Sequence, residues 1–274
     1  MAQQAQSIYI NDTERAELLK LYGSVIENLQ KKLISGSIKS QNYSGDPRAG
    51  SIEFKRFVNS KSQAYGTARA AQKGENVKAP TVTVKLDTHR EIVEEVNQSD
   101  VDKFGVAHFI KRRQNNHIKS MERELERAFF SEAVSAGTLF TTSSTGELKI
   151  LEEMFLKLEK TENDFVDGVD RSLMTAVVST DFYSKIRDKL DELPTFKTDT
   201  TTENFEIYRG VRVRPSIFLP AGTKVSLQVD ESIAMPVSSY PYEAERIPLS
   251  NDVAIELFYD YGCEALAPDL ILNY

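Results

Sequence analysis

The sequence is poor in the residues on which disulfide, metal and redox chemistry depend. Among its 274 residues there are one cysteine, Cys263, three histidines and no tryptophan. A single cysteine excludes an intrachain disulfide and fits a reducing compartment such as the cytosol. No histidine lies near Cys263 in the sequence. We therefore expect Cys263 to be a small hydrophobic residue in a C-terminal strand.

Long apolar runs are also absent. No run approaches the ~18 apolar residues that a membrane-spanning helix needs, so the sequence predicts no contact with a membrane. The opening MAQQAQSIYINDTERAELL has neither a basic segment nor an apolar core, and we expect no secretory signal. The net charge of −7 argues against a general nucleic-acid binder.

Catalytic and cofactor motifs are missing as well. HExxH, CxxC, GxGxxG, GxxxxGK[ST] and GxSxG do not occur. His108 and His117 are nine residues apart on an expected helix, so they face different directions and cannot share a metal. The acidic pairs Glu94–Glu95 and Asp100–Asp102 are more typical of helix caps and solvated faces than of cation sites. We predict no catalytic residue, no cofactor and no metal. An enzyme of mixed α+β fold remains the least supported alternative.

Positive charge is concentrated in one segment. Residues 36–80 carry eight basic and three acidic side chains, a net charge of +5, which leaves −12 on the rest of the chain. A basic segment on an acidic body favours attraction between that segment and the body of another copy. The alternative is a solvated segment whose charge only aids solubility.

The middle of that segment has few hydrophobic side chains and can bury little apolar surface. The stretch KSQAYGTARAAQKGENVKAP, residues 61–80, has Tyr65 as its single large hydrophobic residue. Alternating hydrophobic residues on both sides predict two strands, so the stretch is the tip of a two-stranded arm. Before the tip, Ile52 and Phe54 alternate, and the adjacent pair Phe57 and Val58 interrupts the alternation. After the tip, Val82, Val84 and Leu86 alternate.

Two helices flank the arm. The first covers residues 11–34, with Asn11 or Asp12 as its cap and Gly36 as its end. The second runs from Ser99 or Asp100 to Ala136, where Gly137 stops it. Its first half contains KRRQNNH (111–117), which has no apolar residue and must be exposed or packed on polar groups. The apolar stripe of its second half comprises Ile118, Met121, Leu125, Ala128, Phe129 and Ala133.

The second half of the chain alternates helices and strands. Residues 148–160 and 180–193 predict helices, the latter capped by Thr180 and ended by Pro194, and residues 173–179 predict a buried strand. Strands broken by glycine and proline follow, and the tail contains a long strand. The fold class is α+β.

This order of parts resembles the major capsid proteins of tailed bacteriophages, which have the Hong Kong 97-type fold, and is similar to those of lactococcal siphophages. The order is an amphipathic N-terminal helix, a basic two-stranded arm, a very long helix, an α/β block and long returning strands. The passages GVRVRPSIFLPAG and YDYGCEALAPDLI contribute to the resemblance, which covers essentially the whole chain.

The resemblance implies a division of the chain into four parts. Residues 1–35 correspond to the N-terminal arm and 36–96 to an extended β-hairpin loop. Residues 97–145 with 229–259 correspond to a peripheral domain built on a long spine helix. Residues 146–228 with 260–274 correspond to an axial domain.

The resemblance also implies function and partners. We expect a structural protein that self-assembles as pentamers and hexamers into an icosahedral head around double-stranded DNA, with non-specific DNA contact and a portal protein as a partner. No long segment precedes residue 11, so a separate scaffolding protein is implied. The location is the virion, after assembly in the cytoplasm of the bacterial host. An encapsulin-like nanocompartment shell is the alternative.

We expect subunit contacts at the arm and at the turn-rich loop SSYPYEAERIPLSND. Some members of the family crosslink a lysine to an asparagine, and Lys61, Lys73 or Lys78 with Asn251 are the candidates here, but we predict no crosslink. The expected interface residues are Lys55, Arg56, Lys61, Arg69, Lys73, Lys78, Tyr65, Tyr240, Tyr242 and Arg246.

Overall fold

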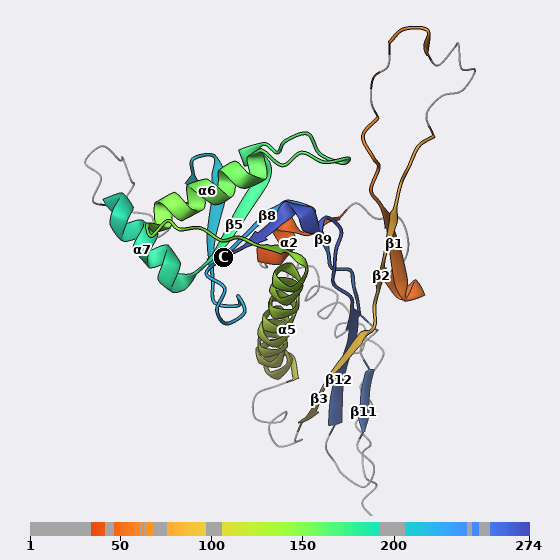
Figure 1. Cartoon of the computed structure of the whole chain (residues 1–274). Helices are drawn as coiled ribbons and strands as arrows, with labels where there is room; N and C mark the ends of the chain where they lie inside the picture. The colour runs from red at the N-terminus through yellow and green to blue at the C-terminus, as the bar shows by residue number, and fades with distance from the viewer. Residues whose placement is uncertain are drawn as a thin grey trace, which may run out of the picture.

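The computed structural model describes residues 34–41, 47–60, 62, 64–67, 76–96, 106–191, 206–239, 243–246 and 253–274. Helices and strands are mixed, as the α+β prediction expected. Figure 1 shows two sheets on either side of the long helix α5, and a β-hairpin that projects away from both. None of the helices in the described ranges is long and apolar enough to cross a membrane.

The larger sheet has six strands in the order β4-β14-β8-β5-β7-β6. β5 pairs in parallel with β7 and antiparallel with β8, and β14 lies between β8 and β4. The strands are β4 (Thr138–Leu139), β14 (Ile271–Asn273), β8 (Val225–Val229), β5 (Met174–Ser179), β7 (Val211–Ser216) and β6 (Ile207–Tyr208).

Two helices cover one face of this sheet. α6 (Glu147–Glu159) and α7 (Thr180–Asp191) bury their apolar sides against alternate residues of β5, whereas Val177 points to the opposite face, toward the core around α5. The expected helices and strand of this region are therefore confirmed. The cap differs: the Phe182 amide donates to Ser179 Oγ at 3.4 Å, so Ser179 and not Thr180 occupies the capping position. Pro194 lies outside the described residues.

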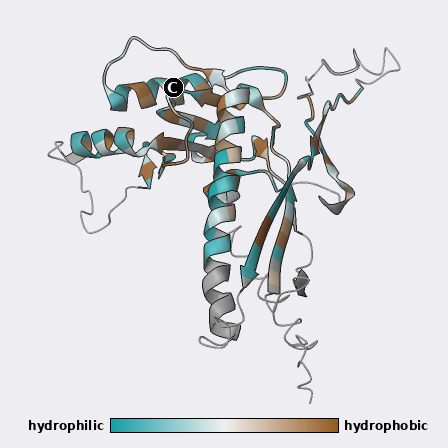
Figure 2. Ribbon diagram, turned by 90° about the horizontal axis from the view of Figure 1, so that it is seen from below, coloured by the Kyte–Doolittle hydropathy of each residue, from teal (hydrophilic) through white to brown (hydrophobic). Residues whose placement is uncertain are grey.

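The helix α5 (Val106–Ala136) stands between the two sheets (Figures 1 and 2). The expected caps Ser99 and Asp100 and the side chain of Ile118 lie outside the described part. The helix ends before Gly137, as predicted. Only glycine fits at this position, because a Cβ there would lie 2.4 Å from Asn273 Nδ2 and 2.6 Å from the Ala133 carbonyl oxygen. The expected stripe is confirmed by the buried residues Met121, Leu125, Phe129 and Ala133, with Phe130 added and Ala128 partly buried.

The smaller sheet centres on β12 (Val253–Tyr261). β3 (Thr88–Val96) pairs with it antiparallel over all nine residues, and β10 (Val237–Ser239) and β11 (Glu243–Arg246) pair with it on the other side. Residues of β12 alternate between faces, and Leu257, Tyr259 and Tyr261 join the core around α5. His117 of α5 is buried and approaches Glu94 of β3 at 3.0 Å, so the apolar-poor first half of α5 packs on a polar group there.

Short elements complete the body. β9 (Ile233–Ala234) pairs with β13 (Glu264–Ala265), and three 3-10 turns are present. The turns are η1 (Pro47–Ala49), η2 (Arg171–Leu173) and η3 (Pro268–Leu270).

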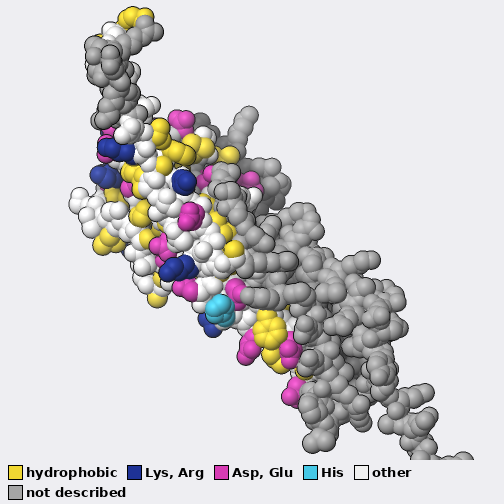
Figure 3. All heavy atoms as spheres, turned by 90° about the vertical axis from the view of Figure 1, so that its right-hand side faces the viewer, with side chains coloured by type: hydrophobic (Ala, Val, Ile, Leu, Met, Phe, Trp, Pro, Cys, Tyr) yellow, Lys and Arg dark blue, Asp and Glu magenta, His cyan; other side chains and the backbone are white. Residues whose placement is uncertain are grey.

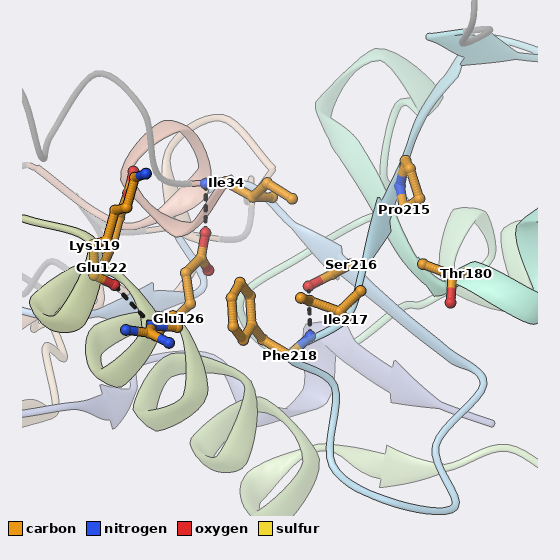
Figure 4. A pocket seen from close by; sticks show the side chains of 10 residues that line it. Ile34, Lys119, Glu122, Glu126, Thr180, Pro215, Ser216, Ile217 and Phe218 are labelled. Carbon is orange, nitrogen blue, oxygen red and sulfur yellow. Dashed lines mark hydrogen bonds between the residues drawn. The ribbon is translucent and has the colours of Figure 1, made fainter. Parts of the chain in front are cut away.

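The short helix α2 (Ile34–Ile38) contains Gly36 in its middle, so the prediction that Gly36 ends a helix is wrong. The reason is tertiary. Glu126 of α5 accepts a hydrogen bond from the Ile34 amide at 2.6 Å (Figure 4) and another from the Ser35 amide at 3.4 Å. Ile38 is buried in the core around α5. These contacts stabilise the helix through Gly36, although glycine has a low helix propensity. The rest of the predicted helix 11–34 lies outside the described residues.

Glu126 predicts a pH-dependent stability. Its side chain is 4% exposed, and burial raises its pKa to about 7 despite the two amide hydrogen bonds. The folded state therefore binds a proton more tightly than the unfolded state. Stability is greatest below the ordinary carboxyl pKa and falls as the pH rises through about 7. Glu126→Gln should remove this slope, which is worth up to about 3 kcal/mol, in urea unfolding at several pH values. An unchanged slope in the variant would contradict the assignment.

Candidate subunit interface

The projecting hairpin consists of β1 (Ser51–Lys55) and β2 (Thr81–Lys85), paired antiparallel with Ile52 opposite Val84 and Phe54 opposite Val82. Its lower part has a core of its own, since Ile52, Phe54 and Val84 are buried against Ala234. The alternation read from the sequence is confirmed here. We call this part, with the residues it packs on, the hairpin root.

The root is held against the body by a close backbone contact. A Cβ at Gly262, which follows β12, would lie 2.0 Å from the carbonyl oxygen of Lys85 and 3.2 Å from Val84 Cγ1. Real Cβ atoms do not approach a backbone oxygen so closely, and only glycine leaves room for β2 at this point.

A half-buried ion pair, called the clamp below, fixes the next residues of the hairpin. Arg56 donates two hydrogen bonds to the Asp269 carboxylate, at 2.6 and 2.9 Å, and its guanidinium lies 4.3 Å from the centroid of the Phe165 ring. Asn163 donates to the same carboxylate at 2.7 Å. Burial opposes ionisation of Asp269, but these hydrogen bonds and the charge of Arg56 hold its pKa below the usual value. Arg56 is thus engaged within its own chain.

Arg56→Ala should lower the free energy of unfolding by about 1–3 kcal/mol, because it leaves Asp269 half-buried without its charged partner. The lowered carboxyl pKa makes the contribution of the pair present above about pH 4 and lost as the pH falls further. Lys55→Ala on the neighbouring exposed position is the control. Equal denaturant midpoints for the two variants at neutral pH would show that the clamp contributes nothing.

Above the clamp the hairpin exposes hydrophobic side chains. The ladder continues through the amide of Val58, which donates to the Lys78 carbonyl at 3.0 Å. Beyond Arg56, however, Phe57 is 61%, Val77 81% and Tyr65 92% exposed. Because the root is anchored, these side chains cannot fold back onto the body without breaking it. The described residues between Arg56 and β2, which are 57–60, 62, 64–67 and 76–80, are called the arm below.

The structure distributes the predicted interface residues unevenly. Lys55, Lys78 and Tyr65 are exposed on the hairpin, and Arg56 pairs with Asp269. Arg246 lies in β11, where only its backbone is described. The structure tests none of these residues as contacts between copies. The remaining candidates, together with the crosslink candidate Asn251, lie outside the described residues: Lys61, Arg69, Lys73, Tyr240 and Tyr242.

A second surface was not singled out from the sequence. The face of β3 and β12 that turns away from α5 carries acidic and hydrophobic side chains. Figure 3 shows this side of the molecule, where acidic and hydrophobic side chains gather beside a histidine. The sequence signal is the alternation in THREIVEEV. Glu91, Glu95 and Val93 are exposed, and Phe258 and Glu256 are half-buried next to them, a set called the acidic face below.

One polar contact borders the acidic face. His89 Nδ1 lies 2.7 Å from Asp260 Oδ1, whereas Glu91 and Glu95 have no basic partner within ion-pair distance among the described residues. The exposed carboxylates and a half-buried aromatic ring match exposed Lys55 and Lys78 of the hairpin and the hydrophobic side chains of the arm. Within the described ranges, no three His, Cys, Asp or Glu side chains are grouped so that they could hold a metal.

Comparisons with known proteins identify the fold. No protein-family model and no curated protein matches the chain. Among solved structures, a protein of Mycobacterium phage Che8 is similar with a TM-score of 0.63 at 15% identity, over 82% of this chain and 84% of that one. The mature capsid of bacteriophage PhiM1 gives 0.55 at 14% identity, over 86% and 83%. The virus-like particle of Pyrococcus furiosus gives 0.57 at 13%, over 93% and 97%.

The chain therefore has a fold that solved capsid and virus-like-particle structures share. More particularly, it has the fold of tailed-phage major capsid proteins, and the resemblance inferred from the order of elements is confirmed.

Proposed function

We propose that the chain is the major capsid protein of a tailed bacteriophage, assembling as pentamers and hexamers into an icosahedral head that encloses double-stranded DNA. In this proposal the hairpin is the extended loop and α5 the spine helix of a Hong Kong 97-type subunit. The two sheets then belong to the peripheral and axial domains, with the boundaries expected from the resemblance.

One observation carries the proposal. The hairpin is anchored at its root, yet Phe57, Tyr65 and Val77 on it remain mostly exposed to solvent. A hydrophobic surface built on a fixed projection is typical of a contact with another molecule. In a shell of identical subunits, that molecule is the next copy.

The acidic face is the receiving surface that fits best. Exposed Lys55 and Lys78 lie on the hairpin, and exposed Glu91 and Glu95 lie on β3. Each exposed ion pair is worth only ~0–1 kcal/mol. Burial of Phe57 and Val77 contributes more, about 1.5–3 kcal/mol for each fully buried side chain. A shell repeats these contacts in every subunit, so weak pairs suffice.

The partners follow from the same proposal. A separate scaffolding protein directs assembly, a portal protein occupies one vertex, and packaged DNA makes non-specific contacts. The head is assembled in the cytoplasm of the bacterial host and becomes part of the virion.

The test is expression of the full chain, alone and together with a candidate scaffolding protein, followed by size-exclusion chromatography and negative-stain electron microscopy. Shells or rings of capsomers are the expected result. A monomer or dimer under every condition, scaffold included, would contradict the proposal.

An encapsulin-like nanocompartment shell is the second candidate, favoured by the match to the Pyrococcus furiosus virus-like particle over nearly the full length of both chains. The contents of purified shells separate the two candidates. Nuclease-protected double-stranded DNA supports the phage head, and a co-purifying folded protein cargo supports the nanocompartment.

A further inference from the structure

Three cations form a row along the exposed surface of α5. Lys119, Arg123 and Arg127 follow each other at intervals of four residues and are all exposed. Residues four apart lie on the same face of a helix, about 6 Å apart along its axis. The row therefore extends over about 12 Å, a small array of positive charge on a chain with a net charge of −7.

The row has no acidic partners within the described part of the chain. The Arg123 guanidinium donates to neutral acceptors, the Lys119 carbonyl at 3.1 Å and Ser120 Oγ at 3.3 Å. Arg127 lies over the Phe218 ring, 6.0 Å from its centroid. No carboxylate of the described residues lies within ion-pair distance of the three cations.

Glu124, which lies on α5 beside the row, is already engaged by other side chains. Glu124 pairs with Arg90 of β3 and accepts hydrogen bonds from the hydroxyls of Tyr259 and Tyr261 at 2.8 and 3.3 Å. It is held on the β3 side of the groove by these three partners. Its charge is therefore balanced by Arg90, and Glu124 forms no ion pair with the row.

The row borders an open groove of about 610 Å³ between α5 and β3. Two of the row residues, Arg123 and Arg127, line it together with Arg90, and the hydroxyls of Ser120 and Ser131 flank them. Guanidinium forks and hydroxyls are the groups that contact phosphate oxygens. A protein partner would need a pocket for a buried aromatic or aliphatic anchor, whereas Ala128 is the one described residue lining this groove whose side chain carries no polar group.

We propose that this groove and the cation row bind the phosphodiester backbone of double-stranded DNA. The site reads no bases, because it consists of cations and hydroxyls arranged along one helix face. The inference rests on the proposed function, since it makes this face of α5 the one turned toward the packaged genome. Three contacts on an acidic protein give weak, salt-sensitive binding, which suits a container that must be filled and emptied.

The test measures binding of the purified full chain to a short fluorescein-labelled DNA duplex by fluorescence anisotropy over a range of salt concentrations. The row variant is Lys119→Gln, Arg123→Gln and Arg127→Gln combined, since glutamine keeps helix propensity. The control removes three exposed lysines around α6: Lys149→Gln, Lys157→Gln and Lys160→Gln. Thermal unfolding checks that both variants fold.

The row variant should bind at least tenfold more weakly at low salt, and the slope of log affinity against log salt should fall by roughly 0.9 for each lost phosphate contact. The control should match the wild type. Equal affinity and slope in the row variant and the control would overturn the inference. If polyglutamate displaces the labelled duplex as effectively as unlabelled DNA does, the inference is overturned, and the groove binds an acidic polypeptide instead.

Electron microscopy of the same preparations distinguishes failure of this inference from failure of the proposed function. Shells formed by the row variant with unchanged DNA binding leave the capsid function standing and reject the groove. Absence of shells in the wild type rejects the capsid function, whatever the duplex shows.

Discussion

Replacement of residues 57–79 by a short Gly-Ser turn is expected to abolish shell formation while the subunit itself stays folded. The replacement retains β1, β2, the clamp between Arg56 and Asp269 and the buried root, because all of these lie outside the removed segment. It removes the exposed hydrophobic residues Phe57, Tyr65 and Val77. The measurement is the fraction of protein in shells by size-exclusion chromatography, with the melting temperature recorded in parallel.

A finer version of this experiment has a matched control. Phe57→Ser with Val77→Ser changes two exposed hydrophobic residues of the arm, and Leu139→Ser with Ile207→Ser changes two of similar exposure, 73% and 63%, on the outer strands of the six-stranded sheet. The arm pair should reduce assembly strongly and the control pair should not. Normal shells from the arm pair and from the shortened hairpin would show that the arm is not an assembly contact.

Gly262→Ala is expected to destabilise the subunit by several kcal/mol, among the largest effects of any single methyl group in this chain. The added Cβ would meet the Lys85 carbonyl oxygen at 2.0 Å and its carbon at 2.8 Å. Both are backbone atoms of a paired strand and cannot rotate away. β2 must shift, which opens the core of Ile52, Phe54 and Val84 under the hairpin.

The measurement is thermal or urea unfolding of the unassembled chain, where a loss of this size lowers the melting temperature by about 10 °C. Gly146→Ala is the control, since the nearest atom to a Cβ there is Lys149 Cβ at 3.9 Å and the backbone φ is −93°. A loss no larger than that of the control would mean that the hairpin root adjusts freely. The anchored projection would then lose its physical basis.

Local patterns in the sequence predicted the elements well and their long-range partners poorly. The alternation of Ile52, Phe54 and Val84 and the stripe from Met121 to Ala133 fixed a hairpin and a helix, because burial of one side follows from periodicity. Nothing in the sequence paired β3 with β12, which are more than 150 residues apart. The end at Gly36 failed for the same reason, since the distant Glu126 decides that backbone.

The candidate interface divides in a similar way. Exposed cations such as Lys55 and Lys78 could be anticipated from composition, because a segment with few hydrophobic residues cannot bury its charges. The acidic face could not, since Glu91 and Glu95 share a face with Phe258 and Glu256 only after two distant strands pair. The pairing of Arg56 with Asp269 likewise required the fold to bring them together.

The position of β14 has a consequence for biosynthesis. This strand fills the gap between β4 and β8, and Asn273 within it donates to the last turn of α5 through the Ala133 carbonyl at 2.9 Å. β14 leaves the ribosome after every other strand of its sheet. A chain whose synthesis stops before residue 271 therefore lacks β14 and leaves the β8 edge unpaired, and an unpaired strand edge is prone to pair with other chains. The six-stranded sheet is thus completed only after β14 has been synthesised, although its other five strands are made earlier.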